Sequence, residues 1–489
     1  MATSHVRVVF GIVGLGLVFG FQGFAASQQR SATRYLAFQM FTGTSDTSVP
    51  IGGSGSNPLS PPPDKDEMSR FVQRLIEEIG TTGQTETKLA FMIGPLAFDH
   101  TDSQLRQMIR DAFRIAREQD IAVGFHIDDS MFWARRADLG RDPANVEWLD
   151  WEGTPNTGRR LDWGAEPIRI APQMCFNSPA IQRAVRHLAH DVIGVAVNEG
   201  IATLEAQGAP ELFAGVIVGW ETQIGRDYAT DAYLGYCALT HLGFSREQPP
   251  QDMDREREQV VQTFIALWAE GIAEAGVDPE KIYAHTAVTS RQTYENRTDD
   301  SVLSYSQVNQ FAPPSITFGA HYQPGFSTYP QPGLMEQLYG ELAQHDNPAW
   351  ASAEGTNIYP ALLTSGGSME TYLAQMFNHG AALANIFGWG VGLETSGNPF
   401  RTAAETTDSI RAYRRFLGGD VLVEGYYVFP DLPNRMQLIQ TQLPTWIPQN
   451  PSRQAEIEAL VLLLSQYIEE NNYQEASRIA DDILAIMTP

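Results

Sequence analysis

The chain has 489 residues, of which 43% are hydrophobic and 10% aromatic, and its formal net charge is −25. A chain of this length and composition can bury one large core, which excludes global disorder. An acidic surface repels phosphate backbones, so nucleic acid is not an expected partner.

The N-terminus has the features of an export signal. Arg7 supplies a positive charge, and Val8–Phe21 is an apolar run that is too short to predict a membrane span. Gly23 and Ala25 then offer small residues at the −3 and −1 positions of a cleavage site. We therefore predict that residues 1–26 are a signal peptide and that the mature protein is secreted or periplasmic, without membrane contact.

Eight short apolar runs follow, and each is succeeded by an amphipathic segment typical of a helix. The runs are apolar on both faces, as expected for strands that lie between a filled interior and covering helices. Polar clusters come at the C-terminal ends of these runs, where a closed barrel gathers them on one face. The sequence therefore predicts an α/β fold of the (β/α)8 TIM-barrel type. The predicted strands are Tyr35–Phe41, Lys88–Phe98, Ile121–Ile127, Phe213–Trp220, Lys281–Val288, Ser315–Tyr322, Pro348–Ala353 and Ala384–Trp389.

The barrel is predicted to occupy residues 27–418, and residues 419–489 form a C-terminal extension packed on or beside it. In the extension, Val421–Pro448 has the pattern of short strands and turns. Arg453–Asn471 and Tyr473–Met487 have the pattern of a helical hairpin. Nothing in the extension indicates chemistry.

The segment Asp128–Asn177, after the third strand, is long for a βα connection. Its tryptophans could stack on sugars and its arginines could grip acidic groups of a substrate. Alternatively, the tryptophans form a small core and the arginines pair with interleaved acids, which is the interpretation we favour. The residues concerned are Trp133, Trp148, Trp151, Trp163, Arg135, Arg136, Arg141, Arg159 and Arg160.

The two cysteines, Cys175 and Cys237, fit two chemical states. In an oxidising compartment they could form a disulfide, and two buried free thiols are the alternative. The sequence leaves both open.

Two glutamates directly follow predicted strands, Glu221 after the fourth and Glu354 after the seventh. Hydrolysis of a glycosidic bond needs two carboxyl groups: one protonates the leaving oxygen, and the other attacks the anomeric carbon or activates water. Either glutamate alone could be a solvated loop residue. The two together, on strands that converge in a barrel, predict a catalytic pair.

This placement resembles the clan A retaining glycoside hydrolases, in topology and in the position of the site, over residues 35–418. The resemblance implies that Glu354 is the nucleophile and Glu221 the acid/base. It further implies cleavage of a β-type (equatorial) glycosidic bond of an oligo- or polysaccharide, with no cofactor and no metal.

The same resemblance implies roles for other strand-end residues. Tyr322 would orient the nucleophile, and His321 would lie at the same strand end as Tyr322. Trp389 would form the floor of the sugar site, and His126 would contact the sugar. Trp220 is a departure, because the clan usually has at this position an asparagine that binds the sugar 2-hydroxyl. We expect the carbohydrate to contact His126, Asp128, Trp133, Trp220, His285, His321 and Trp389.

Two other functions stay open. Trp220 in place of asparagine also fits a non-catalytic carbohydrate-binding barrel. Residues His126 and Asp128, with Asp129 and the histidines His285 and His321, could alternatively ligate the metal of a hydrolase or deacetylase. Adjacent carboxylates point in opposite directions along a strand, which disfavours the metal site. The sequence does not indicate the sugar or the oligomeric state.

Overall fold

The computed structural model describes residues 33–42, 61–161, 168–287, 316–328, 334–355, 368–387, 407–422, 432–469 and 473–487. The predicted signal peptide, Trp163 and Trp389 lie outside these residues, so their predictions stay predictions.

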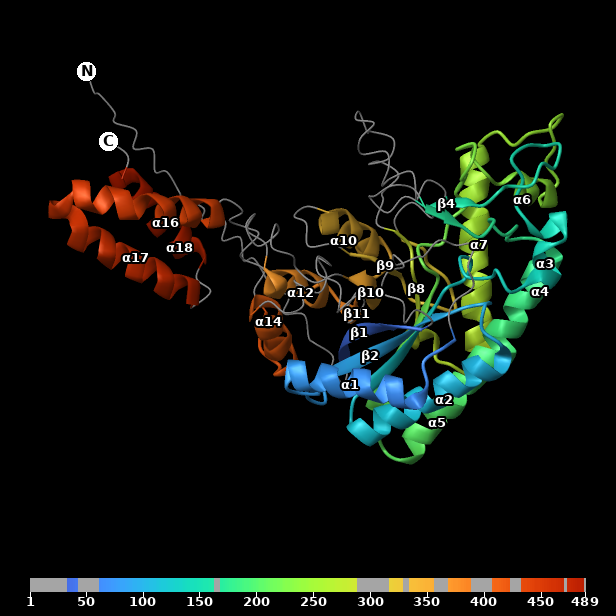
Figure 1. Ribbon diagram of the computed structural model, residues 1–489, viewed down its shortest axis with the longest axis horizontal. Coiled ribbons are helices and arrows are strands. Elements are labelled where there is room, and N and C mark those ends of the chain that lie inside the picture. The colour runs from blue at the N-terminus through green and yellow to red at the C-terminus, as the bar shows by residue number, and fades with distance from the viewer. Residues whose placement is uncertain are drawn as a thin grey trace, which may run out of the picture. The chain divides into compact units, whose positions relative to one another are not determined.

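Eight parallel strands form one sheet in the order β8-β6-β3-β2-β1-β11-β10-β9 (Figure 1). The two ends of this order meet, because Tyr283 bridges Gln323 and Thr286 bridges Phe326 in parallel register. The sheet therefore closes into a (β/α)8 barrel, which confirms the predicted fold. The strands are β1 (Arg34–Phe41), β2 (Thr87–Leu96), β3 (Ala122–Ile127), β6 (Phe213–Val218), β8 (Ile282–Ala284), β9 (Gly325–Ser327), β10 (Trp350–Gly355) and β11 (Ala381–Ile386).

Helices cover the outside of the barrel, and their ends follow local capping chemistry. The first, α1 (Lys65–Ile79), begins at a capping box in which the Asp64 side chain accepts from the Glu67 N–H and the Glu67 side chain accepts from the Asp64 N–H. It ends at Gly80, which adopts the left-handed conformation at φ 82°. The other covering helices are α2 (Asp102–Gln119), α4 (Pro179–Arg186), α5 (Val195–Ala206), α7 (Met253–Glu274), α10 (Leu334–Gln344), α12 (Met369–Phe377) and α14 (Thr407–Leu417).

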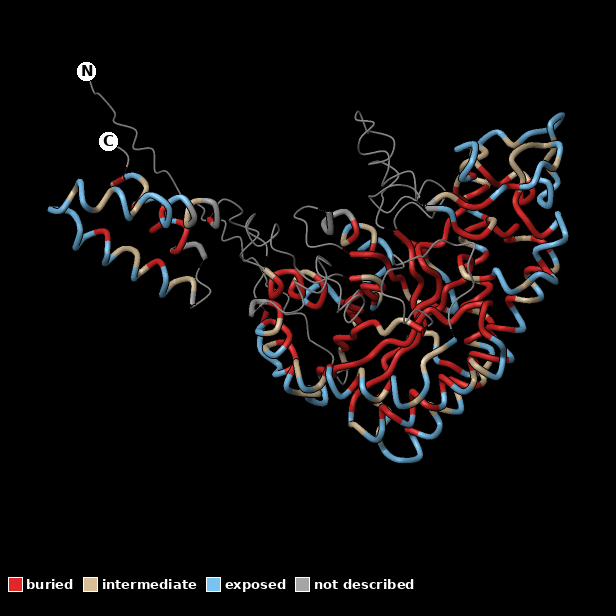
Figure 2. Tube along the Cα trace, viewed as in Figure 1, coloured by how far each residue is buried: buried red, intermediate tan, exposed pale blue. Residues whose placement is uncertain are grey.

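The strands separate two apolar cores, because successive side chains of a strand point to opposite faces. In β1, Tyr35 and Ala37 face the barrel interior, whereas Leu36 and Phe38 belong to the core beneath the helices. Many interior residues are alanines, which suits the narrow lumen of an eight-stranded barrel. Figure 2 accordingly shows strands that are almost wholly buried inside helices with exposed outer faces.

The long segment after β3 contains a short helix, α3 (Ala137–Gly140), and the strands β4 (Arg159–Leu161) and β5 (Ile168–Ile170). These two strands form an antiparallel sheet in the order β5-β4-β7 with β7 (Arg226–Asp227), which comes from the segment after β6. Trp133 is 3% exposed and belongs to the main core, and Arg136 pairs with Asp138 at 2.7 Å. For these residues the structure matches the interpretation of a packed core with paired charges rather than a sugar platform.

Two predicted elements differ in the structure. The sixth strand was expected at Ser315–Tyr322, but a turn bridged between Gly319 and Tyr322 comes there, and β9 follows it. In the extension, the predicted short strands are wrong for residues 432–448, which lie in the helix α16 (Leu432–Gln449). Two prolines inside that helix, Pro444 and Pro448, explain why the sequence suggested turns.

The predicted helical hairpin of the extension is confirmed as α17 (Gln454–Glu469) and α18 (Tyr473–Met487). Together with α16, these helices enclose a separate apolar core that includes Leu432, Ile457 and Ile483. None of the helices in the described ranges is long and apolar enough to span a membrane.

Candidate active site

Glu221 and Glu354 meet at the C-terminal ends of the barrel strands. Glu221 follows β6, the fourth barrel strand, and Glu354 lies in β10, the seventh. One carboxylate oxygen of each glutamate and a ring nitrogen of His285 lie within 4.8 Å of one another. The structure therefore brings together the two carboxyl groups that the sequence paired.

A strained turn delivers Glu221 to this position. Its φ is 52°, in the left-handed region that costs free energy for a residue with a side chain. Gly219, just before it, has φ 96°, and a Cβ there would lie 2.4 Å from the Thr222 Oγ1 atom. The turn after β6 thus requires glycine at 219 and holds Glu221 in an unfavourable backbone conformation, as is common at functional sites.

A chain of hydrogen bonds runs from Glu221 across the barrel interior. The Ser327 hydroxyl donates to Glu221 Oε1 at 2.5 Å, and His285 Nε2 lies 3.0 Å from the Ser327 oxygen. His285 Nδ1 lies 3.1 Å from His126 Nε2, and His126 Nδ1 lies 3.2 Å from Gln39 Oε1. Apart from Glu221, which is 3% exposed, all members are 0% exposed, so water does not compete for these bonds.

His285 and His126, the two histidines in this chain of hydrogen bonds, are neutral. Burial lowers the pKa of His285 to about 3, and burial followed by the proximity of His285 lowers the pKa of His126 well below its usual value. A neutral imidazole donates from one nitrogen and accepts at the other. When the Ser327 proton points to Glu221, His285 Nε2 must donate to Ser327, and His285 Nδ1 must accept from His126 Nε2. The Nδ1 atom of neutral His126 then carries no proton and does not donate to Gln39 Oε1.

Glu354 is the more open of the two carboxyl groups, with 19% of its side chain exposed. Burial, and then the negative charge of Glu221, raise the pKa of Glu354 well above its usual value. His285 Nε2 lies 3.9 Å from Glu354 Oε2 and so faces both carboxyl groups. The pair therefore retains a shared proton at a pH where isolated carboxyl groups would both be ionised.

Two more carboxyl groups, those of Asp128 and Asp129, are buried, and Asp129 contacts the turn that carries Glu221. Asp128 Oδ1 accepts from the backbone N–H groups of Ser130, Met131 and Phe132, and Asp129 accepts from the Thr222 hydroxyl at 2.5 Å. Burial and then the charge of Asp129 raise the pKa of Asp128 to about 7, and burial raises that of Asp129 to about 6. The Asp128 side chain thus stabilises the turn that follows it, and the predicted sugar contact by this residue is not supported.

Arg159 compensates this buried acidic cluster. It is 2% exposed, and its positive charge acts on Asp128, Asp129 and Glu221. The arginine comes from β4, in the long segment after β3, so this segment supplies a buried positive charge to the site.

The structure corrects the role predicted for His126. The ring is 0% exposed, both nitrogens have partners, and it stacks on Trp220 with centroids 4.4 Å apart and planes 11° apart. Trp220 is itself 3% exposed and packs edge-on against Phe41 and Phe387. These two rings therefore support the hydrogen-bonded chain and are not an open surface for a sugar, and His285 is equally buried.

The expectation for Tyr322 is also corrected. It precedes Gln323, whose N–H donates to Ile282 at the start of β8, so Tyr322 lies at the amino end of the sixth strand and not at the catalytic end. Its hydroxyl pairs with the Thr317 hydroxyl at 2.7 Å. His321 is exposed in the same turn. The polar residue that the sixth strand delivers to the site is Ser327.

Several participants were not predicted from the sequence: Gln39, Thr222, Ser327 and Asn385. Arg159 was named in the long segment, but not as a partner of the acids at the site. Gln39 had a usable signal, because it is a polar residue at an interior-facing position of an apolar strand. Ser327 was missed because the sixth strand was placed too early.

A cation could be considered at Glu221, His285 and Glu354, whose donor atoms come close together. However, the Ser327 hydroxyl already engages both Glu221 and His285. The arrangement is therefore explained by hydrogen bonding. The predicted alternative set does not assemble, since His321 is exposed at the other end of its strand and Asp128 is held by backbone N–H groups.

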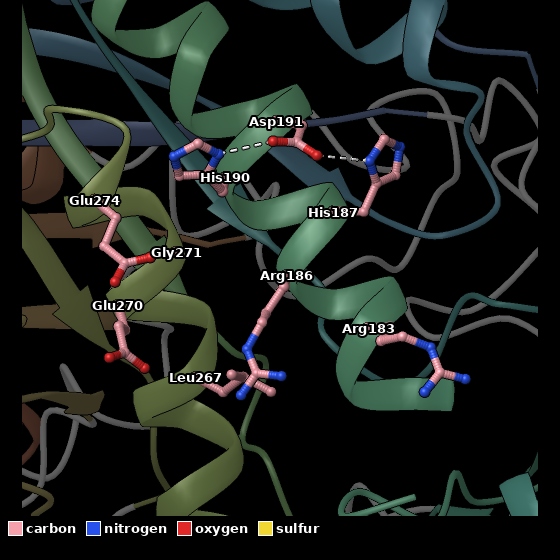
Figure 3. Close-up of a pocket in the computed structure, with 9 residues that line it drawn as sticks. All are labelled: Arg183, Arg186, His187, His190, Asp191, Leu267, Glu270, Gly271 and Glu274. Carbon is pink, nitrogen blue, oxygen red and sulfur yellow. Dashed lines mark hydrogen bonds and ion pairs between the residues drawn. The ribbon is translucent and has the colours of Figure 1, made fainter. Parts of the chain in front are cut away.

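A cavity of about 550 Å³ lies elsewhere, between the α4–α5 stretch and α7 (Figure 3). Figure 3 shows His187 and His190 both reaching Asp191, with Glu270 and Glu274 on the facing helix. None of its lining residues belongs to the candidate site, so this cavity is not the substrate cleft.

No protein-family model and no curated protein matches the chain. Among solved structures, the catalytic domain of β-amylase from Paenibacillus polymyxa is similar, with a TM-score of 0.46 and 10% identity over 79% of this chain and 98% of that one. A GH26 β-mannanase from Bacteroides ovatus has a TM-score of 0.30 and 10% identity over 79% and 88% of the two chains. An α-amylase from Malbranchea cinnamomea has a TM-score of 0.29 and 11% identity over 83% and 77%. These likenesses are weak, and the barrel is established by the strand pairing of this chain itself.

Proposed function

We propose that the protein is a glycoside hydrolase that cleaves a β-type (equatorial) glycosidic bond of an oligo- or polysaccharide with retention of configuration. The observation that carries the proposal is the proximity of Glu221 and Glu354, whose nearest carboxylate oxygens lie within 4.8 Å. Retaining enzymes hold their carboxyl groups about 5–5.5 Å apart, whereas inverting enzymes need roughly 6.5–9.5 Å to admit a water molecule. With the predicted signal peptide, the proposed site of action is outside the cytoplasm.

Glu354 is the nucleophile in this proposal, as the resemblance implies, so the proton that the pair shares must lie on Glu221 when the bond is cleaved. Its carboxylate oxygen forms a bond to the anomeric carbon while the bond to the leaving oxygen breaks, and Glu221 gives that oxygen a proton. Glu221 then takes a proton from water, and the resulting hydroxide displaces Glu354 from the same carbon. Two displacements restore the starting configuration.

The hydrogen-bonded chain suits this mechanism, because Glu221 must change its protonation state twice in each turnover. When Glu221 is ionised, the Ser327 proton points to it. When Glu221 is protonated, its own proton can point to Ser327, whose hydroxyl then turns to His285 Nε2. Since neutral His285 can exchange its donor and acceptor nitrogens, the hydrogen bond between Ser327 and His285 can be kept in both states.

The test is turnover of a panel of aryl β-glycosides by the wild type and by Glu354→Gln and Glu221→Gln, with Glu270→Gln on α7 as a control. We expect both active-site variants to lose at least about 1,000-fold in kcat, the control to match the wild type, and the first product seen by NMR to keep its β configuration. Near-normal activity of Glu354→Gln, or an inverted first product, would overturn the proposal. Activity that EDTA abolishes and zinc restores would instead favour a metal-dependent hydrolase.

A further inference from the structure

Cys175 and Cys237 come from different segments and meet inside the protein. Cys175 closes the long segment after β3, and Cys237 lies in the helix α6 (Tyr236–His241), in the segment after β6. Both side chains are 0% exposed, and their sulfur atoms lie within 4.8 Å of each other. Sequence position alone did not require this encounter.

Backbone contacts hold both cysteines in one seam. The Cys175 N–H donates to Asn145 C=O at 2.9 Å, and the Cys237 N–H donates to Glu147 Oε2 at 3.1 Å. The Cys237 thiol points to Ala144 C=O at 3.5 Å. Residues 144–147 therefore hold the backbone of both cysteines, whose side chains are free thiols in this structure.

We infer that Cys175 and Cys237 form a disulfide that ties the segment after β3 to the segment after β6. The two thiols lose two electrons and two protons as the sulfur–sulfur bond forms. A disulfide-bearing oxidant, such as oxidised glutathione, accepts them and becomes two thiols. This inference does not depend on the proposed hydrolase activity.

A bound metal is the competing explanation, because a ring nitrogen of His241 also lies within 4.8 Å of both sulfurs. A structural zinc site needs four ligands, and the described residues bring together only these three donors. His241 is moreover exposed, and Glu147, whose Oε2 atom accepts from the N–H groups of Cys237 and Ala238, does not belong to this set of donors. The donor set therefore fits a disulfide better than a closed metal site.

The timing of oxidation follows from burial. Neither sulfur is accessible in the folded protein, and burial raises the pKa of the Cys175 thiol well above its usual value. A buried thiol that stays protonated exchanges slowly with external oxidants. The bond is therefore expected to form during folding, and an oxidant added to the folded, reduced protein should act slowly.

The crosslink would join the two halves of the buried charged cluster. The segment after β3 carries Asp128, Asp129 and Arg159, and the segment after β6 carries Glu221 and Thr222. Because these groups interact across the two segments, a disulfide would limit their separation during local unfolding.

The experiment is to refold the full chain in a mixture of reduced and oxidised glutathione, with and without excess dithiothreitol. Thiols are then alkylated under denaturing conditions, and the intact mass is measured. We expect no alkylation after oxidative refolding, two alkylations after reduction, and a melting temperature roughly 5–10 °C higher for the oxidised protein. The variant Cys175→Ser/Cys237→Ser should show no response to the reductant.

Two outcomes would overturn the inference. One is alkylation of both thiols after oxidative refolding. The other is one zinc ion per chain by elemental analysis, released by a chelator under denaturing conditions together with two free thiols. If the double variant does not fold, the comparison of oxidised and reduced wild type still decides between these outcomes.

Discussion

Ser327 donates a 2.5 Å hydrogen bond to Glu221, although the two residues come from different strands and lie far apart in the sequence. This bond links the end of the sixth barrel strand to the turn after the fourth. It makes Ser327 a positioning residue for the proposed acid/base, and it is the contact through which the buried histidines act.

Replacing Ser327 with alanine removes this donor. A hydrogen bond to a charged group contributes about 1.5–3 kcal/mol, so we expect kcat to fall roughly 10- to 150-fold. The loss disfavours the ionised form of Glu221, which should move the basic limb of the pH profile of kcat/KM to higher pH. Ser327→Thr keeps the hydroxyl and serves as the control. An unchanged profile in Ser327→Ala would remove the positioning role while leaving the proposed hydrolase intact.

Asp128→Asn should stabilise the protein, and more at pH 8 than at pH 5. The folded-state pKa of Asp128 is about 7, above its unfolded value, so the folded state binds a proton that the unfolded state lacks between pH 4 and 7. The wild type therefore gains stability from this group as the pH falls through 7. Asparagine keeps an oxygen for the three N–H donors and removes the buried charge. Thermal melts at both pH values are the measurement, and a larger gain at pH 5 would contradict the assigned protonation.

Arg159→Met should be strongly destabilising, by about 3–5 kcal/mol at pH 8, because it leaves the buried carboxylates without their counter-charge. The cost should shrink at pH 5, where Asp128 and Asp129 are largely protonated in the folded state. The neighbouring Arg160→Met, whose side chain is 28% exposed, is the matched control. Urea denaturation of both variants at the two pH values tests this, and equal effects of the two substitutions would refute it.

Gly219→Ala should reduce both stability and activity. The new Cβ would meet the Thr222 hydroxyl at 2.4 Å, and the backbone has a positive φ. Gly208 also has a positive φ, at 72°, but a Cβ at that position would have no neighbour within 4 Å, so Gly208→Ala isolates the backbone cost of about 1 kcal/mol. We expect the Gly219 variant to lose more in denaturation melts and to lower kcat, whereas Gly208→Ala should leave kcat unchanged.

The barrel and the glutamate pair could be predicted because their signals are local. Apolar runs mark strands, and Glu221 and Glu354 follow their runs directly, so a count of strands placed both on one face. Tyr322 and His126 were assigned from the resemblance rather than from local pattern. The turn at Gly319 put Tyr322 at the wrong end of its strand, and tertiary packing closed His126 behind Trp220. Arg159 was named among the arginines of the long segment, but its burial beside Asp128, Asp129 and Glu221 could not be found from sequence, since it depends on contacts between distant segments.

The buried polar chain has a consequence for folding fidelity. Gln39, His126, Ser327 and Asn385 lie in four different strands of the barrel, and His285 directly follows a fifth. A slip of one residue in the register of any of these strands would turn its polar side chain away from the lumen. The buried polar groups next to it would then lose their hydrogen-bond partners. Misregistered barrels would thus be penalised by the same contacts that hold Glu221. The groups that serve the proposed chemistry therefore also favour the correct strand register during folding.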